Sequence, residues 1–491
     1  MDIIFSEKKE KIILFLVFVL AIFLITFHFT DTPKVWVDEG VFTETAKNLA
    51  MHGTLGIQTA QGEFFSMRNF LLSTSYPVIF PVALSLKLFG AGLWQARLPM
   101  IIYMFILVVL FYFFVRKKYG FHPAILSVLM LLSFSPFYGN GRPVQGEVPG
   151  LVFLVFGALL LLYLEESSFR DNYHSKKWAI LSGLAFGLSA STKPIFLVIL
   201  PISLLITLFF WIKKVENRKI LWFFVLGFIL PVILWAFIHV STVDLFLIFI
   251  SKSFHLASNI DSPATPLIKT IFTNFLRFFT ESTPILFSFL FCTVVTALSF
   301  RFFKKINETF SIAEYLILSF IILNLLTYLA GTGWYRYFFP AHTLLYLFFP
   351  ASILVLSQVF KKKVLKNMLF VIPIALILFQ FYHLIFLSDT SFTIKRTRNY
   401  ELAKTLSEIN PSQKVLFYGV VETVIFLKGD NYSQYFSMGD FFEAGNKNIS
   451  NSSDFDFILI DSLKNANFQL YCYNTNPLGR YFFLQKIKGC H

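Results

Sequence analysis

The chain has 491 residues, of which 56% are hydrophobic, only 14% are charged and 65 are Phe. A soluble domain carries about 25% charged residues, so this composition excludes an ordinary soluble protein and predicts a polytopic membrane protein. The formal net charge is +14, but the basic residues fall in short clusters between apolar runs and not on one face. We therefore expect no nucleic-acid partner, and we attribute the charge to membrane topology and anionic lipid.

About eleven apolar runs have the length, roughly 17 to 25 residues, that a helix needs to cross a bilayer. They are residues 12–29, 97–115, 122–138, 148–164, 178–192, 195–212, 220–240, 284–302, 312–330, 338–358 and 367–387. Clusters of Lys and Arg separate the runs, and alternating sides place every cluster on one face, which the positive-inside rule assigns to the cytoplasm. The N-terminus is then cytoplasmic, and a bacterial plasma membrane is the expected location.

The first outer loop, about residues 30–96, carries two helix signals. Asp38 is expected to cap an amphipathic helix that runs to about Met51, and Tyr76-Pro77 is expected to open a second one that ends at Phe89. Both helices are too short to span with ease, so we expect them to lie along the membrane surface.

The composition changes after the last apolar run, where Asn becomes frequent and strand-like alternation begins. A helix over 397–409 and strands near 414–419 and 455–461 predict a small extracytoplasmic α/β domain over residues 388–491. Residues 1–387 then form the transmembrane domain.

Of the three cysteines, Cys292 lies in an apolar run, whereas Cys472 and Cys490 lie in the expected outer domain. A disulfide between the latter two and a pair of free thiols both remain open, because pairing cannot be derived from sequence.

Several charged residues lie at the predicted outer ends of the apolar runs, where topology does not call for them. They are Asp38, Glu39, Arg142, Glu147, Lys193 and Arg336. A charge at membrane depth costs a few kcal/mol, so such residues usually face a cavity or a partner. A carboxylate in a polar cavity can accept a proton from an acceptor hydroxyl, and Arg and Lys can hold a phosphate.

Short motifs around these charges share one membrane side and a consistent order. They are Val37–Gly40 with Phe89-Gly90 and Ala96–Leu98, then Gly183–Ser189 with Thr192–Pro194, and finally Arg336-Tyr337. In combination they resemble the C-type glycosyltransferases of the protein O-mannosyltransferase and aminoarabinose-transferase type. The likeness covers about residues 30–345 and leaves the last apolar runs and the C-terminal domain unexplained.

The resemblance implies a C-type glycosyltransferase fold and an inverting enzyme that moves a sugar from a polyprenyl-phosphate donor to an acceptor outside the cytoplasm. In this family's pattern Asp38 would be the base that deprotonates the acceptor hydroxyl, and Glu39 would orient or support it. Glu147 would position the acceptor, contact a metal, or do neither. A glycolipid, a protein or a cell-wall polymer fits as acceptor.

The resemblance also implies a binding site for the donor phosphate. Lys193 and Arg336, with Tyr337 beside the latter, would hold the phosphate and stabilise it as it leaves. Arg97 and Arg142 are second-rank candidates for the same task. No cofactor is firmly expected, although a divalent cation remains an open alternative.

Ordinary structural roles compete with each of these assignments. Asp38 and Glu39 also suit a helix cap and first turn, Lys193 and Arg336 suit contact with lipid headgroups, and Glu147 suits the boundary of a span. A transporter or flippase of lipid-linked sugars is the alternative function. A transporter would be expected to place its charges near mid-membrane and to have two similar halves. In this sequence the charges collect on one face and the halves are unalike.

Overall fold

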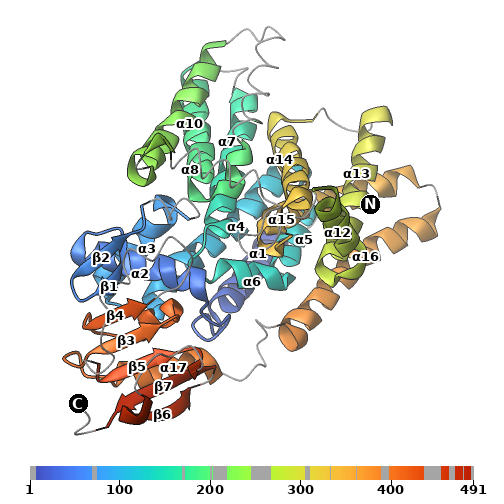
Figure 1. Ribbon diagram of the computed structural model, residues 1–491. Helices are drawn as coiled ribbons and strands as arrows, with labels where there is room; N and C mark the ends of the chain where they lie inside the picture. The colour runs from blue at the N-terminus through green and yellow to red at the C-terminus, as the bar shows by residue number, and fades with distance from the viewer. Residues whose placement is uncertain are drawn as a thin grey trace. The chain divides into compact units, whose positions relative to one another are not determined.

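The computed structural model describes residues 7–68, 74–167, 172–199, 202, 218–240, 242–244, 267–304, 310–331, 333–360, 362–388, 397–435, 455–463, 470–478 and 480–487. The chain divides into two compact units (Figure 1). The helical unit consists of residues 1–27, 102–141 and 146–392, and the α/β unit of residues 28–101, 142–145 and 393–491.

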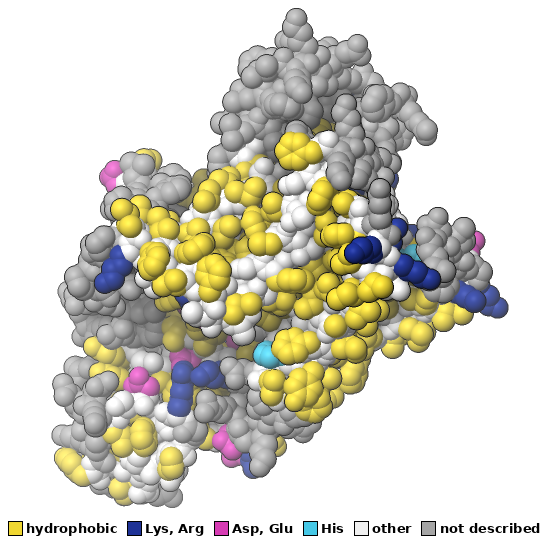
Figure 2. Space-filling model, turned by 90° about the vertical axis from the view of Figure 1, so that its right-hand side faces the viewer, with side chains coloured by type: hydrophobic (Ala, Val, Ile, Leu, Met, Phe, Trp, Pro, Cys, Tyr) yellow, Lys and Arg dark blue, Asp and Glu magenta, His cyan; other side chains and the backbone are white. Residues whose placement is uncertain are grey.

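Helices form nearly all of the described part of the helical unit. They are α1 (Glu7–Thr26), α4 (Leu93–Tyr119, from residue 102 on), α5 (Phe121–Ser133), α6 (Ser135–Gly141), α7 (Glu147–Ser167), α8 (Asn172–Thr192), η2 (Pro194–Val198), α10 (Arg218–His239), α12 (Leu267–Thr280), α13 (Ser282–Lys304), α14 (Ile312–Ala330), α15 (Tyr335–Val359), α16 (Lys363–Tyr382) and η3 (His383–Leu387). Large apolar side chains are exposed on many of them, and Figure 2 shows such a surface, as expected for helices that face lipid.

Seven helices in the described residues are long and apolar enough to cross a membrane, or up to eight if the bent pair α5 and α6 is one span. These seven helices confirm seven of the predicted runs, namely 97–115, 148–164, 220–240, 284–302, 312–330, 338–358 and 367–387. The predicted run 12–29 corresponds to α1, and 178–192 to α8, but neither passes as a span by length and composition. Most of the run 195–212 lies outside the described residues, so the expected number of about eleven is not confirmed.

Small residues bring α8 and α10 into close contact, and α7 packs on the other side of α8 (Figure 1). A Cβ at Gly183 would overlap the backbone of Phe224, and one at Gly187 would overlap that of Phe228. The two glycines of the sequence motif are therefore helix-packing positions. Through this contact they fix the end of α8, which Lys193 follows.

A buried carboxylate joins three helices where α4 and α13 end and α14 begins. Glu314 completes a capping box with Ser311 and accepts hydrogen bonds from Arg301 at 2.8 Å and from Tyr119 at 2.5 Å. Lys118 lies 3.2 Å from its other oxygen. Two of the basic residues assigned to the cytoplasmic face thus neutralise an acid that sequence reasoning did not single out.

The α/β unit combines the first outer loop with the C-terminal residues. Its elements are α2 (Val37–His52), β1 (Gly56–Ala60), β2 (Glu63–Ser66), α3 (Tyr76–Phe89), α17 (Thr397–Ser407), β3 (Val415–Tyr418), η4 (Val421–Phe426), β4 (Tyr432–Tyr435), β5 (Phe457–Ile460), η8 (Leu470–Cys472), β6 (Tyr473–Leu478) and β7 (Tyr481–Lys486). The sheet order is β4-β3-β5-β7-β6; β3 is parallel to β4 and β5, and β7 is antiparallel to β5 and β6. Leu416, Ile458, Ile460 and Leu484 form its apolar core.

The helix and strands expected after residue 397 are confirmed, as are the ends of α2 and α3 at Gly53 and Gly90. The expected cap is wrong, because α2 begins at Val37 and Trp36 is its N-cap, which places Asp38 inside the first turn. Helix α2 is also buried on all sides from Glu39 to Asn48, so this stretch has no free apolar face to lay on a membrane surface.

The two compact units divide the chain differently from the predicted domains. Residues 28–101 belong to the same unit as residues 393–491, whereas the sequence grouped the first outer loop with the transmembrane helices. In that unit Cys472 is disulfide-bonded, whereas Cys490 lies outside the described residues. In the helical unit Cys292 is free and exposed.

Candidate functional site

Glu39 and Arg97 form a buried ion pair in the α/β unit. Glu39 lies in the first turn of α2 and Arg97 near the start of α4, and neither side chain is exposed to solvent. The guanidinium donates from Nε to Glu39 Oε1 at 2.7 Å and from Nη2 to Oε2 at 2.8 Å. This two-point contact is one that the compact ammonium of lysine could not reproduce.

The other N–H groups of Arg97 donate hydrogen bonds to the segment before α2, residues 29–33. Nη1 donates to the carbonyl oxygens of Phe29 at 2.7 Å and Thr32 at 3.4 Å, and Nη2 to that of Pro33 at 2.9 Å. With the two bonds to Glu39, these contacts use all the N–H groups of a guanidinium. The geometry therefore favours a positioning role for Arg97 over the phosphate binding that the resemblance implied.

Arg142 is buried in the same unit and holds the same segment. Its Nη1 donates to Thr32 Oγ1 at 2.7 Å and to the Thr32 carbonyl oxygen at 3.3 Å. The backbone N–H of Val144 donates to Glu39 Oε1 at 3.4 Å. Residues 142–145 are thus linked by hydrogen bonds to Glu39 and Thr32. Arg142, like Arg97, helps to hold α2 in place.

Asp38 precedes Glu39 but is only half-buried. Successive residues of a helix point about 100° apart, so the two adjacent acids face different surroundings. The Glu39 side chain contacts Arg97. Of the two acids, Glu39 is buried and Asp38 is partly exposed.

Glu147 and Lys193 form a second buried ion pair, in the helical unit. Glu147 is the first residue of α7, and Lys193 lies between α8 and η2. Their side chains are 0% and 5% exposed, and the Lys193 ammonium donates to Glu147 Oε1. A Cβ at Gly146 would lie 3.0 Å from that of Lys193, so the glycine allows the two helix ends to approach.

Arg336 and Tyr337, in the first turn of α15, extend this cluster. The Lys193 ammonium lies 5.6 Å from the centre of the Tyr337 ring, and the Arg336 guanidinium lies 4.9 Å from the same ring and 4.9 Å from that of Trp334. Arg336 Nη2 also donates to the Tyr337 hydroxyl at 3.1 Å. Two cations and one carboxylate thus surround one aromatic ring, which leaves a net positive charge suited to a phosphate.

The predicted site residues therefore form two groups. The helical unit brings together Glu147, Lys193, Arg336 and Tyr337, and the α/β unit brings together Asp38, Glu39, Arg97 and Arg142. Each group lies at the ends of helices, where a short polar stretch follows or precedes an apolar run.

Sequence reasoning missed Glu44, which is fully buried on α2. Its Oε1 accepts hydrogen bonds from the Gln58 backbone at 3.0 Å, the Tyr432 hydroxyl at 3.0 Å and the Gln434 amide at 2.6 Å. Burial raises the pKa of Glu44 from 4.5 to about 7, although these hydrogen bonds and Lys47 oppose the shift. No local pattern marks this residue, because two of its partners lie almost 400 residues further along the chain.

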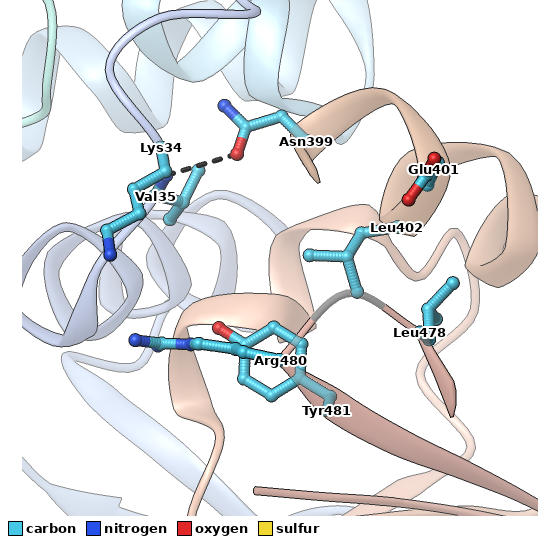
Figure 3. A pocket seen from close by; sticks show the side chains of 8 residues that line it. All are labelled: Lys34, Val35, Asn399, Glu401, Leu402, Leu478, Arg480 and Tyr481. Atoms are coloured by element: carbon cyan, nitrogen blue, oxygen red, sulfur yellow. Dashed lines mark hydrogen bonds between the residues drawn. The ribbon is translucent and has the colours of Figure 1, made fainter. Parts of the chain in front are cut away.

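The segment before Asp38 borders a small pocket (Figure 3). The Val35 backbone donates to Asn399 Oδ1 at 3.2 Å, and the basic side chains of Lys34 and Arg480 extend to the same side of the pocket. A larger groove of about 490 Å³ lies between the start of α4, α17 and the end of η4, with Trp94 on its wall. Both hollows belong to the α/β unit.

No group of three His, Cys, Asp or Glu side chains suited to hold a metal ion occurs among the residues that the structure describes. The divalent cation that the sequence left open as an alternative stays untested.

Comparison with known proteins supports the resemblance. Residues 77–235 match the model of a family described as dolichyl-phosphate-mannose-protein mannosyltransferase. No curated protein matches the chain.

Solved structures match over nearly the whole length. ArnT from Cupriavidus metallidurans in the apo state has a TM-score of 0.61 and 11% identity, covering 98% of this chain and 99% of that one. The same protein bound to undecaprenyl phosphate has a TM-score of 0.61 and 11% identity, with 99% of each chain covered. The Archaeoglobus fulgidus oligosaccharyltransferase, in complex with Zn and sulfate, has a TM-score of 0.55 and 12% identity over 91% of this chain and 68% of that one.

These matches confirm the predicted fold. The chain has the helical membrane fold of the C-type glycosyltransferases, together with a small C-terminal domain that contains a β-sheet.

Proposed function

We propose that this chain is an integral-membrane glycosyltransferase that moves a sugar, with inversion at its anomeric carbon, from a polyprenyl-phosphate donor to an acceptor hydroxyl or phosphate outside the cytoplasm. The observation that carries the proposal is the cluster of Lys193, Arg336 and Tyr337 at the helix ends of the membrane-spanning unit. The fold match to a protein solved with undecaprenyl phosphate over 99% of both chains supports the donor class.

Lys193 and Arg336 are proposed to bind the donor phosphate. The Arg336 guanidinium lies over two aromatic rings and donates to the Tyr337 hydroxyl, so its fork is oriented before a ligand arrives, and Lys193 adds a point charge. As the sugar–phosphate bond breaks, negative charge develops on the departing polyprenyl phosphate, and the two cations stabilise it. Glu147 is then the counterion of Lys193, and the acceptor-positioning role considered for it becomes a secondary one.

Asp38 is proposed to be the catalytic base. Its carboxylate takes the proton of the acceptor hydroxyl, the acceptor oxygen forms a bond to the anomeric carbon, and the carbon–oxygen bond to the phosphate breaks with its electron pair on the leaving group. Glu39 and Arg97 act through Asp38, because their ion pair fixes the first turn of α2 and the chain before it.

The charge distribution along the helices supports catalysis on the extracytoplasmic side. The basic cluster at 116–118 lies in the last turn of α4, and Arg301 lies near the end of α13. Glu147 begins α7, and Arg336 lies in the first turn of α15. In an alternating arrangement of spans these two sets fall on opposite faces, and the basic clusters face the cytoplasm. The disulfide of Cys472 suits an oxidising compartment.

The proposal is tested by reconstituting the purified full-length protein in liposomes with a radiolabelled polyprenyl-phosphate sugar and an acceptor extract. Wild type is expected to transfer label, and Asp38→Asn to lose transfer by about 100-fold or more while it still binds undecaprenyl phosphate. Asp461→Asn, an exposed acid of the same unit, is the matched control and keeps its transfer rate.

Unchanged transfer in Asp38→Asn would overturn the assignment of the base. Label that crosses the bilayer still attached to its lipid, with no transfer in wild type, would instead identify a transporter.

A further inference from the structure

Helix α12 buries the polar residue Asn274, whereas most of its other side chains are apolar and exposed. Ile268, Phe272 and Phe279 are each more than half exposed, whereas Asn274 is 4% exposed and Phe278 is 6% exposed. A buried amide without partners would be costly on an otherwise apolar helix. Its hydrogen bonds therefore indicate what the helix holds in place.

Asn274 holds the end of α14. Its Nδ2 group donates to the carbonyl oxygens of Tyr328 at 3.2 Å, Leu329 at 3.1 Å and Gly331 at 2.9 Å. The last carbonyl groups of a helix have no partners within the helix itself. The Asn274 side chain supplies a partner for two of them and for the Gly331 carbonyl that follows the helix, so it caps α14 from a neighbouring helix.

Arg277 holds the residues that follow. Its Nη1 donates to the Gly333 carbonyl oxygen, and its Nε and Nη2 donate to the two carboxylate oxygens of Glu281 at 2.6 and 3.0 Å. Gly333 has φ +71°, and a Cβ there would overlap Asn274 and Arg277. The backbone conformation therefore favours glycine at this position, and a side chain there would displace the ends of the Asn274 and Arg277 side chains.

Phe278 completes the contact with the start of α15. Its ring lies 5.7 Å from that of Tyr328 and 5.5 Å from that of Phe338, edge to face in both cases. Arg336 lies in the chain between Gly333 and Phe338, so α12 contacts the backbone on one side of it and a side chain on the other.

We infer that Asn274, Arg277 and Phe278, the α12 brace, position Arg336 for its contact with the donor phosphate. The inference rests on the proposed function, in which Arg336 binds that phosphate. Arg277 is a positioning residue and not a second phosphate ligand, because its fork is occupied by Glu281 and its Nη1 by the backbone. A catalytic cation must be held within a fraction of an ångström, and support from neighbouring elements supplies that precision.

The test measures binding of undecaprenyl phosphate to the full-length protein in nanodiscs. Arg277→Ala and Asn274→Ala are each expected to weaken binding by roughly fivefold to tenfold, the effect of losing one or two well-formed hydrogen bonds. Arg277→Lys, which can still reach the Gly333 carbonyl, is expected to recover part of the loss. Lys269→Ala removes a charge from an exposed position of the same helix and is expected to bind as wild type does.

A double-mutant cycle separates positioning from general loss of structure. If the α12 brace acts through Arg336, Arg277→Ala has little further effect in a protein that already carries Arg336→Ala, so the two losses are not additive. Additive losses, or normal binding in both α12 variants while Arg336→Ala weakens it, would overturn the inference and leave the proposed function standing. Normal binding in Arg336→Ala would overturn both.

Discussion

The two buried ion pairs differ in how completely they are satisfied. Glu39 meets Arg97 through both oxygens and receives a further backbone hydrogen bond. Glu147 meets Lys193 through Oε1, while its buried Oε2 has no hydrogen-bond partner among the described residues. A saturated pair is a structural support, whereas the Glu147–Lys193 pair leaves a buried carboxylate oxygen that can still accept a hydrogen bond.

The substitution Glu147→Gln should show whether Glu147 acts as a counterion of Lys193 or as a catalytic acid. Loss of the carboxylate raises the net charge around Tyr337, so undecaprenyl phosphate is expected to bind roughly fivefold more tightly. The unfolding midpoint should fall, because the buried Lys193 loses its partner. Binding by the full-length protein is the measurement, with the exposed Glu401→Gln as control; weaker binding would contradict the counterion role.

Glu44 predicts how the stability of the α/β unit depends on pH. Its pKa is raised from 4.5 to about 7, so between these values the folded state holds a proton that the unfolded state has released. The free energy of unfolding should therefore decrease as pH rises through this window. Glu44→Gln keeps the shape and should flatten that dependence in denaturant unfolding at pH 5 and pH 7. An unchanged slope in the variant would show that another group is responsible.

Among the elements, α2 packs closely against C-terminal residues of the α/β unit. Gly40, directly after Asp38 and Glu39, lies against the backbone of η4 at Glu422. Glu422 in turn accepts hydrogen bonds from Arg480 and from the Tyr481 hydroxyl. The turn that carries the proposed base is therefore packed against C-terminal residues, which gives those residues a role in holding it.

Gly40→Ala and Gly53→Ala compare a steric effect with a conformational one on the same helix. A Cβ at Gly40 would overlap Glu422, whereas Gly53 has open space around it but φ +69°. Gly53→Ala should cost about 1 kcal/mol, and Gly40→Ala about 3 kcal/mol, although alanine is the better helix former. Thermal unfolding of the two variants measures the difference, and equal midpoints would argue against the close packing.

At the scale of the whole molecule, the features that sequence predicted are the ones that local patterns encode. Apolar length identifies the seven helices of the described residues that are long and apolar enough to cross a membrane, and strand alternation identifies β3 and β5. The contact of α2 with β4 depends on pairs such as Glu44 and Gln434, 390 residues apart. No local pattern records such pairs, so the sequence does not indicate that residues 28–101 and 393–491 form one compact unit.

For the candidate site, the sequence indicated the charged residues but not the partner of each charge. Charges at helix ends identified Lys193, Arg336 and Glu147, because their cost in a membrane is a local property. The partner of each charge was not predictable. For Arg97 the sequence favoured phosphate binding, whereas its hydrogen bonds to Glu39 and to three carbonyl groups favour a positioning role.

The topology of the whole chain can be tested with single cysteines. In a Cys292→Ser background, Lys404→Cys on α17 and Lys363→Cys at the start of α16 both occupy exposed positions. If the α/β unit is extracytoplasmic and the basic clusters are cytoplasmic, a membrane-impermeant maleimide should label the first in intact cells and the second only after permeabilisation. The reverse pattern would place Asp38 on the cytoplasmic side, and an extracytoplasmic transferase would then be untenable.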